Sequence, residues 1–176
     1  MSGDPAAFNE LAQTQIGRLY GIAKLIVRDP DRAADVTQDA LVAAWRDLSA
    51  LRDADRFEAW LHRVLVRTCH REARRERRQR TAEVRELPLD NTPGLDELPQ
   101  VANRDELERG FRRLSVDERA IIVLHHVEGL ALAEVADVMG LPLGTVKSRL
   151  HRSLQTMRAA LESDARTVAL DPGRIA

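Results

Sequence analysis

The sequence predicts an all-α protein in which two small helical domains are joined by a flexible linker, and three observations lead to this prediction. Apolar residues recur at helical spacing along most of the 176-residue chain, and no run alternates as a half-buried strand would. Residues 81–103 break the pattern with three prolines, one glycine and five acids against one Arg, which is typical of a linker. Only 3% of the residues are aromatic, so aliphatic side chains must form the cores. We therefore expect domains at residues 1–80 and 104–165 and a tail at 166–176.

The first domain is expected to contain three helices. Pro5 suits the first turn of the first helix, which should end before Pro30 because a residue preceding proline avoids helical backbone. The second and third helices are expected at residues 31–48 and 56–80. The predicted buried positions are Phe8, Leu11, Leu19, Ile22 and Ile26 in the first helix, Val36, Ala40, Leu41, Ala44, Trp45 and Leu48 in the second, and Phe57, Trp60, Leu61, Val64, Leu65 and Thr68 in the third.

The second domain is expected to contain four helices. Ser115 and Glu118 have the spacing of a capping box, which marks a helix start. Gly140 lies where one helix must turn into the next, a position that favours positive φ. The expected ranges are 104–114, 116–128, 132–139 and 144–163.

The strongest local pattern is a helix-turn-helix over residues 132–158. Ala136 is small where two helices would cross closely, and the apolar side of the second helix is expected to face the core through Val146, Leu150, Leu154 and Leu161. Hydrogen-bond donors on the outer face, near the start of that helix, are what insertion into the DNA major groove requires. A plain helical hairpin with a basic surface is the alternative. The outer face is predicted to carry Lys147, Ser148, His151, Arg152 and Gln155.

The formal net charge of −1 argues against a nucleic-acid binder only until the charges are placed along the chain. Residues 56–80 hold nine Arg against three Glu, and residues 141–158 hold four cations and no acid. Each of these helices could neutralise several phosphates. A single basic run is more often a solvated helix face, but two runs, one of them on a helix-turn-helix, favour nucleic acid.

Other classes of protein are not supported by the sequence. It has no apolar run of membrane-spanning length, no secretory signal and a single cysteine, which predicts a cytoplasmic protein without membrane insertion. The pair His125-His126 and the set His62, Cys69 and His70 lack metal-ligand spacing and are expected to be packing or surface residues. Without a nucleophile–base arrangement or a phosphate loop, we predict no enzyme activity, no cofactor and no metal.

Segments of both predicted domains resemble one family. GTVKSRLHRS after LAEVADVMG resembles the promoter −35-binding domain of bacterial RNA polymerase sigma factors of the extracytoplasmic-function (ECF) group in the sigma-70 family. DVTQDALVAAWRDL and RFEAWLHRVLVRTCHREARRERR resemble the region 2 helices that bind core polymerase and open the −10 element. Residues 1–80 would then be a region 2-like domain and residues 104–165 a region 4-like domain.

The resemblance implies roles for particular residues, which are expectations at this point. It implies a sigma factor that directs core RNA polymerase to promoter DNA, with catalysis left to the polymerase, and leaves open an anti-sigma factor as a further partner. Trp60 matches a common family tryptophan, for which structural packing is favoured over base stacking. Arg149 is expected to contact backbone or the domain's own acids. The implied sets are Asp35, Gln38 and Asp39 for core polymerase, Trp60, Arg63, Arg67, Arg71, Arg74 and Arg75 for −10 DNA, and Lys147, Ser148, Arg149, His151 and Arg152 for −35 DNA.

The chain also departs from the family pattern. Arg67 and Arg71 stand where Asn and Asp are common, which should strengthen phosphate attraction and leaves the −10 sequence preference open. Ala131 and Leu143 stand where capping side chains are common, so both helix starts should be weakly capped. Each missing cap should cost about 1 kcal/mol of stability.

Two other functions compete with the sigma factor. One is a stand-alone helix-turn-helix regulator whose first domain senses a ligand or dimerises. The other is an interaction protein that only sequesters a partner, which would have no use for a basic recognition face. The acids and amide at positions 35, 38 and 39 beside an Arg-rich helix favour the sigma factor, since a regulator does not need them.

Overall fold

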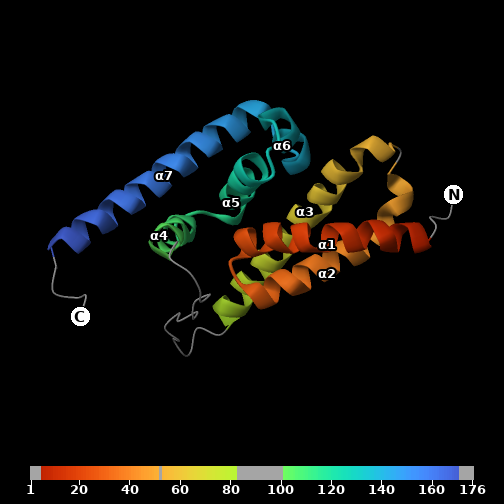
Figure 1. Ribbon diagram of the computed structural model, residues 1–176, viewed down its shortest axis with the longest axis horizontal. Coiled ribbons are helices and arrows are strands. Elements are labelled where there is room, and N and C mark those ends of the chain that lie inside the picture. Colours follow the sequence, from red (N-terminus) through yellow and green to blue (C-terminus); the bar gives the residue numbers. More distant parts are fainter. Residues whose placement is uncertain (1–4, 52, 83–100, 171–176) are drawn as a thin grey trace.

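The computed structural model describes residues 5–51, 53–82 and 101–170, and within these ranges it contains helices and no strand. Helices α1 (Pro5–Val27), α2 (Pro30–Asp47) and α3 (Phe57–Ala82) form the first bundle, with two 3-10 turns, Leu48–Ala50 and Ala54–Arg56, between α2 and α3 (Figure 1). The all-α prediction is confirmed. Most of the predicted linker, 83–100, and the last part of the predicted tail, 171–176, lie outside the described residues.

The turn between α1 and α2 follows from its sequence. Asp29 is extended and accepts a hydrogen bond on its side chain from the Arg32 backbone N–H at 2.9 Å, which caps α2. Pro30 occupies the first turn, where its missing N–H costs nothing. Arg28 takes the left-handed conformation, with φ of 64°, and so reverses the chain within two residues.

The second bundle contains α4 (Val101–Arg112), α5 (Val116–Ile122), α6 (Leu132–Met139) and α7 (Leu143–Leu170). The predicted helix over 116–128 is split, because a π-helical turn, η3 (Val123–Val127), follows α5. Helix α4 starts three residues earlier than expected, and α7 continues seven residues beyond its expected end. The Ser115 capping box is present, with the Glu118 carboxylate accepting from the Ser115 backbone N–H at 2.8 Å.

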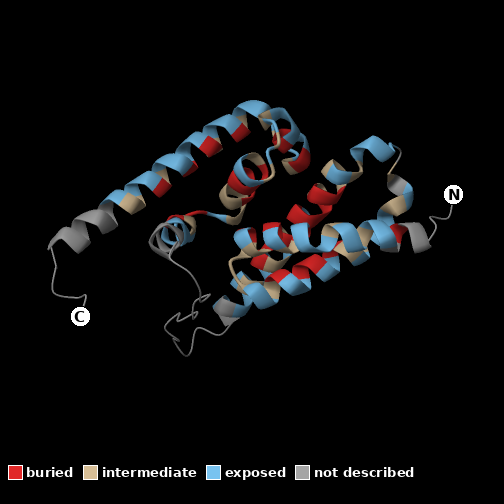
Figure 2. Ribbon diagram, in the orientation of Figure 1, coloured by how far each residue is buried: buried red, intermediate tan, exposed pale blue. Residues whose placement is uncertain are grey.

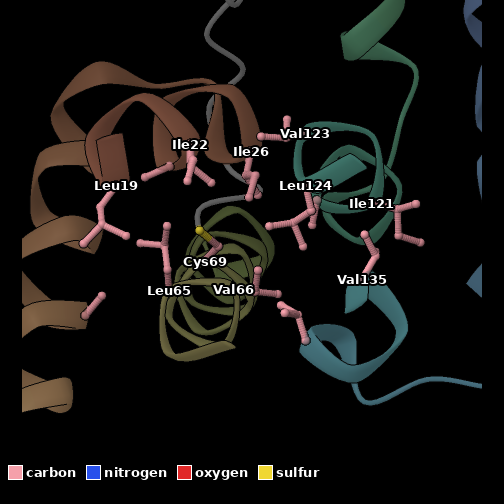
Figure 3. Packing of buried hydrophobic residues seen from close by; sticks show 14 of the residues in the cluster. Leu19, Ile22, Ile26, Leu65, Val66, Cys69, Ile121, Val123, Leu124 and Val135 are labelled. Carbon is pink, nitrogen blue, oxygen red and sulfur yellow. The ribbon is translucent and has the colours of Figure 1, made fainter. Parts of the chain in front are cut away.

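The two bundles share one continuous core of buried side chains. Helix α3 packs against α1 and α2 and also against α5 and α6, while α1 contacts α5 and η3. Figure 2 shows buried positions on the faces that meet, with much of the outer face of α7 exposed. In Figure 3, Leu65 and Val66 leave α3 in different directions, Leu65 toward α1 and Val66 toward the second bundle, where Leu124 and Val135 lie. α3 is therefore buried on both sides.

Two predicted core positions in the first domain are wrong. Leu11 is 48% exposed and Trp45 is 40% exposed. Both lie toward the far end of the first bundle, where the Trp45 ring leans on Phe8 with ring centroids 5.1 Å apart. Helical periodicity gives the direction of a side chain but does not tell where along the helix the covering elements end.

One predicted core position of α7 is also wrong. Leu154 is 42% exposed, whereas Ser153 and Met157 are buried. A helix has 3.6 residues per turn, so each step of four residues drifts by about 40° around the axis. Leu154, two such steps after the buried Val146, has rotated out of the core, and a step of three from Leu150 to Ser153 restores the face.

Candidate nucleic-acid and protein interfaces

The turn before α7 sets the direction of its outer face. Gly140 ends α6 in the left-handed conformation, with φ of 65°, and the next residue donates its N–H to the Ala136 carbonyl at 3.0 Å. The Pro142 carbonyl then accepts from the N–H groups of Thr145 and Val146 at 2.9 and 3.1 Å, which starts α7. Val146 is buried, and the next two residues, Lys147 and Ser148, are exposed.

Four of the five residues predicted for −35 DNA are exposed on α7, namely Lys147, Ser148, His151 and Arg152. The ring Nε2 of His151 lies 3.0 Å from the side-chain nitrogen of Gln155, and the Ser148 hydroxyl donates to the Thr145 carbonyl at 3.0 Å. Within the described residues, Lys147 and Arg152 form no ion pair. This face presents donors and positive charge to solvent.

Arg149 differs from those four. Its Nη1 donates to Asp117 Oδ2 at 2.8 Å, and its side chain is about one-third exposed. The ion pair ties α7 to the first turn of α5. Arg149 therefore contributes to the position of α7 within the domain.

The start of α6 lacks a capping side chain, as the sequence indicates. Ala131 is extended at the cap position and offers no side-chain acceptor. The Glu134 carboxylate accepts from the Ala131 backbone N–H at 2.7 Å, so only one half of a capping box is formed.

The arginines predicted for −10 DNA are not equivalent. Arg67, Arg71, Arg74 and Arg75 are exposed on α3. Arg63 is half-buried, and its Nη2 donates to the carbonyl oxygen of Asp137 in α6 at 2.8 Å. One member of the set is thus occupied by the second domain.

Trp60 is half-buried near the start of α3. Its ring centroid lies 6.0 Å from that of Phe57, and the ring packs against the core. This position is consistent with the packing role that the sequence favoured.

The structure brings three arginines of the −10 set together with the core-polymerase set in one groove, which the sequence did not predict. A groove of about 810 Å³ runs between α2 and α3. Its α2 wall is acidic and amidic and its α3 wall is basic, so the two candidate interfaces face each other across one cleft. The predicted residues that line it are Asp35, Gln38 and Asp39 from α2 and Arg71, Arg74 and Arg75 from α3.

A second polar group, which the sequence did not indicate, lies between the domains. The carboxylate of Glu128 accepts from Arg18 Nε of α1, and its Oε2 lies 3.6 Å from His62 Nε2 of α3. Arg119 of α5 donates from Nε to the Ile26 carbonyl at 2.6 Å. Burial lowers the pKa of Arg119 to about 10. These partners are about 65 to 110 residues apart in sequence, so no local spacing could have revealed them.

Of the residues considered for metal binding, His126 is exposed and the others are buried or paired. His62 and Cys69 are buried in α3, and burial raises the pKa of the Cys69 thiol to about 12. His70 Nε2 lies 2.9 Å from Asp117 Oδ1. In the part of the chain that the structure describes, no cluster of three or more His, Cys, Asp and Glu side chains has the geometry of a metal site, and no helix is long and apolar enough to cross a membrane.

Comparison with known proteins gives two family matches in the same order as the two bundles. Residues 11–79 match the model of sigma-70 region 2, and residues 104–157 match that of sigma-70 region 4. The chain is 33% identical over 154 residues to the ECF RNA polymerase sigma factor SigM of Mycobacterium tuberculosis, covering 87% of this chain and 76% of that protein. It is 33% identical over 172 residues to the RNA polymerase sigma-E factor of Streptomyces avermitilis, covering 94% and 93%.

Solved structures agree on the fold. The sigma factor RpoE from Bartonella quintana, in complex with the anti-sigma factor NepR, aligns with a TM-score of 0.74 at 22% identity, over 90% of this chain and 98% of that one. CnrH in complex with the cytosolic domain of CnrY aligns with a TM-score of 0.63 at 28% identity, over 93% and 92%. Both family regions in order, together with the 33% identity to an ECF sigma factor over most of both chains, establish that this protein belongs to the sigma-70 family, in the extracytoplasmic-function group of RNA polymerase sigma factors.

Proposed function

We propose that this chain binds core RNA polymerase in the cytoplasm and directs it to specific promoters, with α7 reading −35 DNA and α3 opening −10 DNA. The observation that supports this most is the pairing of an exposed donor face on α7 with a basic α3 in a chain that matches regions 2 and 4 in order. Catalysis belongs to the polymerase, since sigma factors are initiation subunits.

The −35 contact is proposed for Lys147, Ser148, His151 and Arg152. These side chains share one exposed face of α7, directly after the turn. Arg and Lys recognise guanine edges in the major groove, and Ser hydroxyls donate to bases or phosphates. Arg149, which is held by Asp117, is proposed to act through the orientation of α7.

The −10 contact is proposed for the exposed arginines of α3, of which Arg71, Arg74 and Arg75 line the α2–α3 groove. Opened single-stranded DNA requires a positive surface that follows its phosphates. Arg67, Arg71, Arg74 and Arg75 are exposed on α3 and can supply that charge. Arg63 joins them only when it leaves Asp137.

The acidic wall of the same groove is proposed to meet core polymerase. Asp35, Gln38 and Asp39 are exposed on α2. Because they line the same groove as the arginines, polymerase and the −10 strand would bind side by side at this cleft.

The experiment that tests the proposed function is transcription in vitro with purified core polymerase and a library of bacterial promoter fragments. Addition of the full chain should produce starts at a defined subset of fragments that core polymerase alone does not use. The matched variant Arg152→Ala should lose those starts, whereas Arg158→Ala, an exposed cation further along α7, should keep them. No promoter-dependent start with the wild-type chain would refute the proposal.

An inhibitory protein partner is proposed as well. Its support is the Bartonella structure, in which a sigma factor of the same fold is bound to an anti-sigma factor. A protein that co-purifies with this chain and suppresses its transcription in the purified assay would establish such a partner. A co-purifying protein that leaves transcription unchanged would not be an anti-sigma factor.

A further inference from the structure

The contact between the two domains has an apolar centre. Val66 of α3 and Ile26 of α1 are buried, as are Val123, Leu124 and Val135 from the second domain, and all belong to one cluster (Figure 3). Burial of such side chains favours the closed arrangement. The closed arrangement is thus a defined state of the molecule.

At the edge of that contact, the Glu128 carboxylate and the His62 imidazole form one titratable pair. The Glu128 side chain is only 7% exposed and is already neutralised by Arg18. His62 lies beside it, with Nε2 3.6 Å from the carboxylate and Nδ1 buried without a hydrogen-bond partner in the described structure. A neutral imidazole can leave one nitrogen as an unpaired acceptor, but imidazolium would bury an unpaired N–H donor there.

A second titratable pair lies around Asp117. Its carboxylate is shared between Arg149 of α7 and His70 of α3, at 2.8 and 2.9 Å. His70 Nε2 is close to Asp117 but is not aligned for a hydrogen bond. The other charged groups facing His70 are Arg74 and Arg77 on its own helix. Arg149 already offsets the charge of Asp117, so this carboxylate only partly favours a protonated His70.

Both histidines are consequently harder to protonate in the closed form. Burial lowers the pKa of His62, partly offset by Glu128, while Arg18 lowers it further and Glu58 raises it. Burial also lowers the pKa of His70, partly offset by Asp117. If opening restores ordinary values near 6.5, the open form binds more protons. The closed form is then fully favoured above about pH 6.5 and loses stability as the pH falls below that value.

The closed form also occupies a residue proposed for DNA. Arg63 donates to the Asp137 carbonyl, so it cannot contact the −10 strand while α6 covers α3. Opening would release Arg63 and uncover the neighbouring surface of α3.

We propose that the interface between the two domains is an acid-releasable clasp, in which protonation of His62 and His70 separates the domains and frees Arg63. The two histidines respond together because each faces a carboxylate from the second domain that an arginine already neutralises. The promoter consequence rests on the proposed function, whereas the opening itself does not.

The first test measures the distance between the domains in the full chain. Donor and acceptor dyes are attached through Gln13→Cys in α1 and Ala159→Cys in α7, both exposed positions. The native Cys69 is buried, with a pKa raised to about 12, and does not compete for maleimide at pH 7. Energy transfer should be high and constant from pH 8 to 7 and should fall between pH 6.5 and 5.5. The opening constant can rise by at most about tenfold per pH unit for each extra proton.

Variants identify the groups that respond. The double variant His62→Gln with His70→Gln should remove the pH dependence, because glutamine does not titrate. The control His126→Gln replaces an exposed histidine of the second domain and should respond as the wild type does. Far-UV circular dichroism recorded in parallel should show unchanged helicity through the transition.

Three results would overturn the clasp. These are energy transfer that does not change with pH, a fall accompanied by loss of helicity, and a double variant that opens like the wild type. A parallel assay of promoter-dependent transcription distinguishes failure of the clasp from failure of the proposed function. If transcription works and energy transfer is flat, only the clasp is refuted; if transcription fails at every pH, the distance measurement still decides whether the clasp exists.

Discussion

The two basic helices of this protein are used in different ways. On α7, Arg149 is held by an acid of its own domain, and Lys147 and Arg152 remain exposed on one face. Helix α3 is buried on two sides, and one of its arginines, Arg63, bonds to the second domain. A basic helix on an outer surface can bind DNA as it stands. A basic helix between two domains must exchange some of its internal contacts for contacts with DNA.

The largest expected effect comes from breaking the apolar contact on α3. Val66→Asp would bury an unpaired charge between the domains, which costs at least about 4 kcal/mol if the closed form is kept. Separation of the domains lets the carboxylate reach water, so we expect the variant to open and keep its helices. Small-angle scattering should show a larger radius of gyration with unchanged circular dichroism.

The neighbouring exposed position gives the control for that change. Arg67→Asp alters the charge on the adjacent residue, which lies on the exposed side of α3. It should leave the radius of gyration unchanged. A compact Val66→Asp variant with wild-type stability would contradict the described contact.

The next effect concerns the exposed face of α7. If Arg152 reads a base, Arg152→Ala should weaken binding to a −35 duplex by about 1–3 kcal/mol and should remove the preference for that base. If it holds a phosphate, binding should weaken equally for all sequences, and the salt slope should fall by about one. Fluorescence anisotropy at several salt concentrations separates these outcomes, with Arg158→Ala as the control. Equal binding by wild type and Arg152→Ala would remove this residue from the interface.

A smaller effect is expected at the acidic wall of the α2–α3 groove. Asp39→Arg places a fifth cation beside four arginines and reverses the charge offered to polymerase. Association with core polymerase should weaken by about tenfold, or about 1.4 kcal/mol. The control Asp47→Arg makes the same charge change at the end of α2, outside the groove. Co-elution with core that is the same for both variants would argue against this wall as the polymerase contact.

The sequence predicted the helices better than it predicted their surroundings. Caps and turns are local, so Pro30, Ser115 and Gly140 marked helix ends that the structure confirms. The core prediction is wrong for Leu11 because periodicity carries no information on which elements cover a helix, and for Leu154 because steps of four residues drift around the helix axis.

For the candidate sites, too, the sequence predicted what lies on one helix but not what depends on packing between helices. The α7 face could be predicted because its residues are adjacent on one helix. The groove between α2 and α3 could not be predicted in this way, because it depends on how the two helices pack against each other. The group formed by Glu128, His62 and Arg18 could not be predicted, because its members come from both domains and no local spacing relates them.

The smallest expected effect separates the stability of the second domain from its closure onto the first. Helix α6 supplies the Asp137 carbonyl to Arg63, but its own start is only half capped, with Glu134 in place and no acceptor at Ala131. The backbone of Ala131 is extended, with φ of −62° and ψ of 150°, close to the −68° and 164° of the capping residue Ser115. Ala131→Ser should therefore complete the capping box and stabilise the second domain by about 0.5–1 kcal/mol.

Ser115→Ala is the matched opposite change and should cost about 1 kcal/mol. Thermal unfolding of the full chain measures both. Neither residue contributes a side chain to the contacts between the domains, so the pH dependence of energy transfer should remain that of the wild type in both variants. A shift in that pH dependence would mean that closure of the domains depends on the internal stability of the second domain. The exposed basic helix α7 and the enclosed basic helix α3 would then not behave independently.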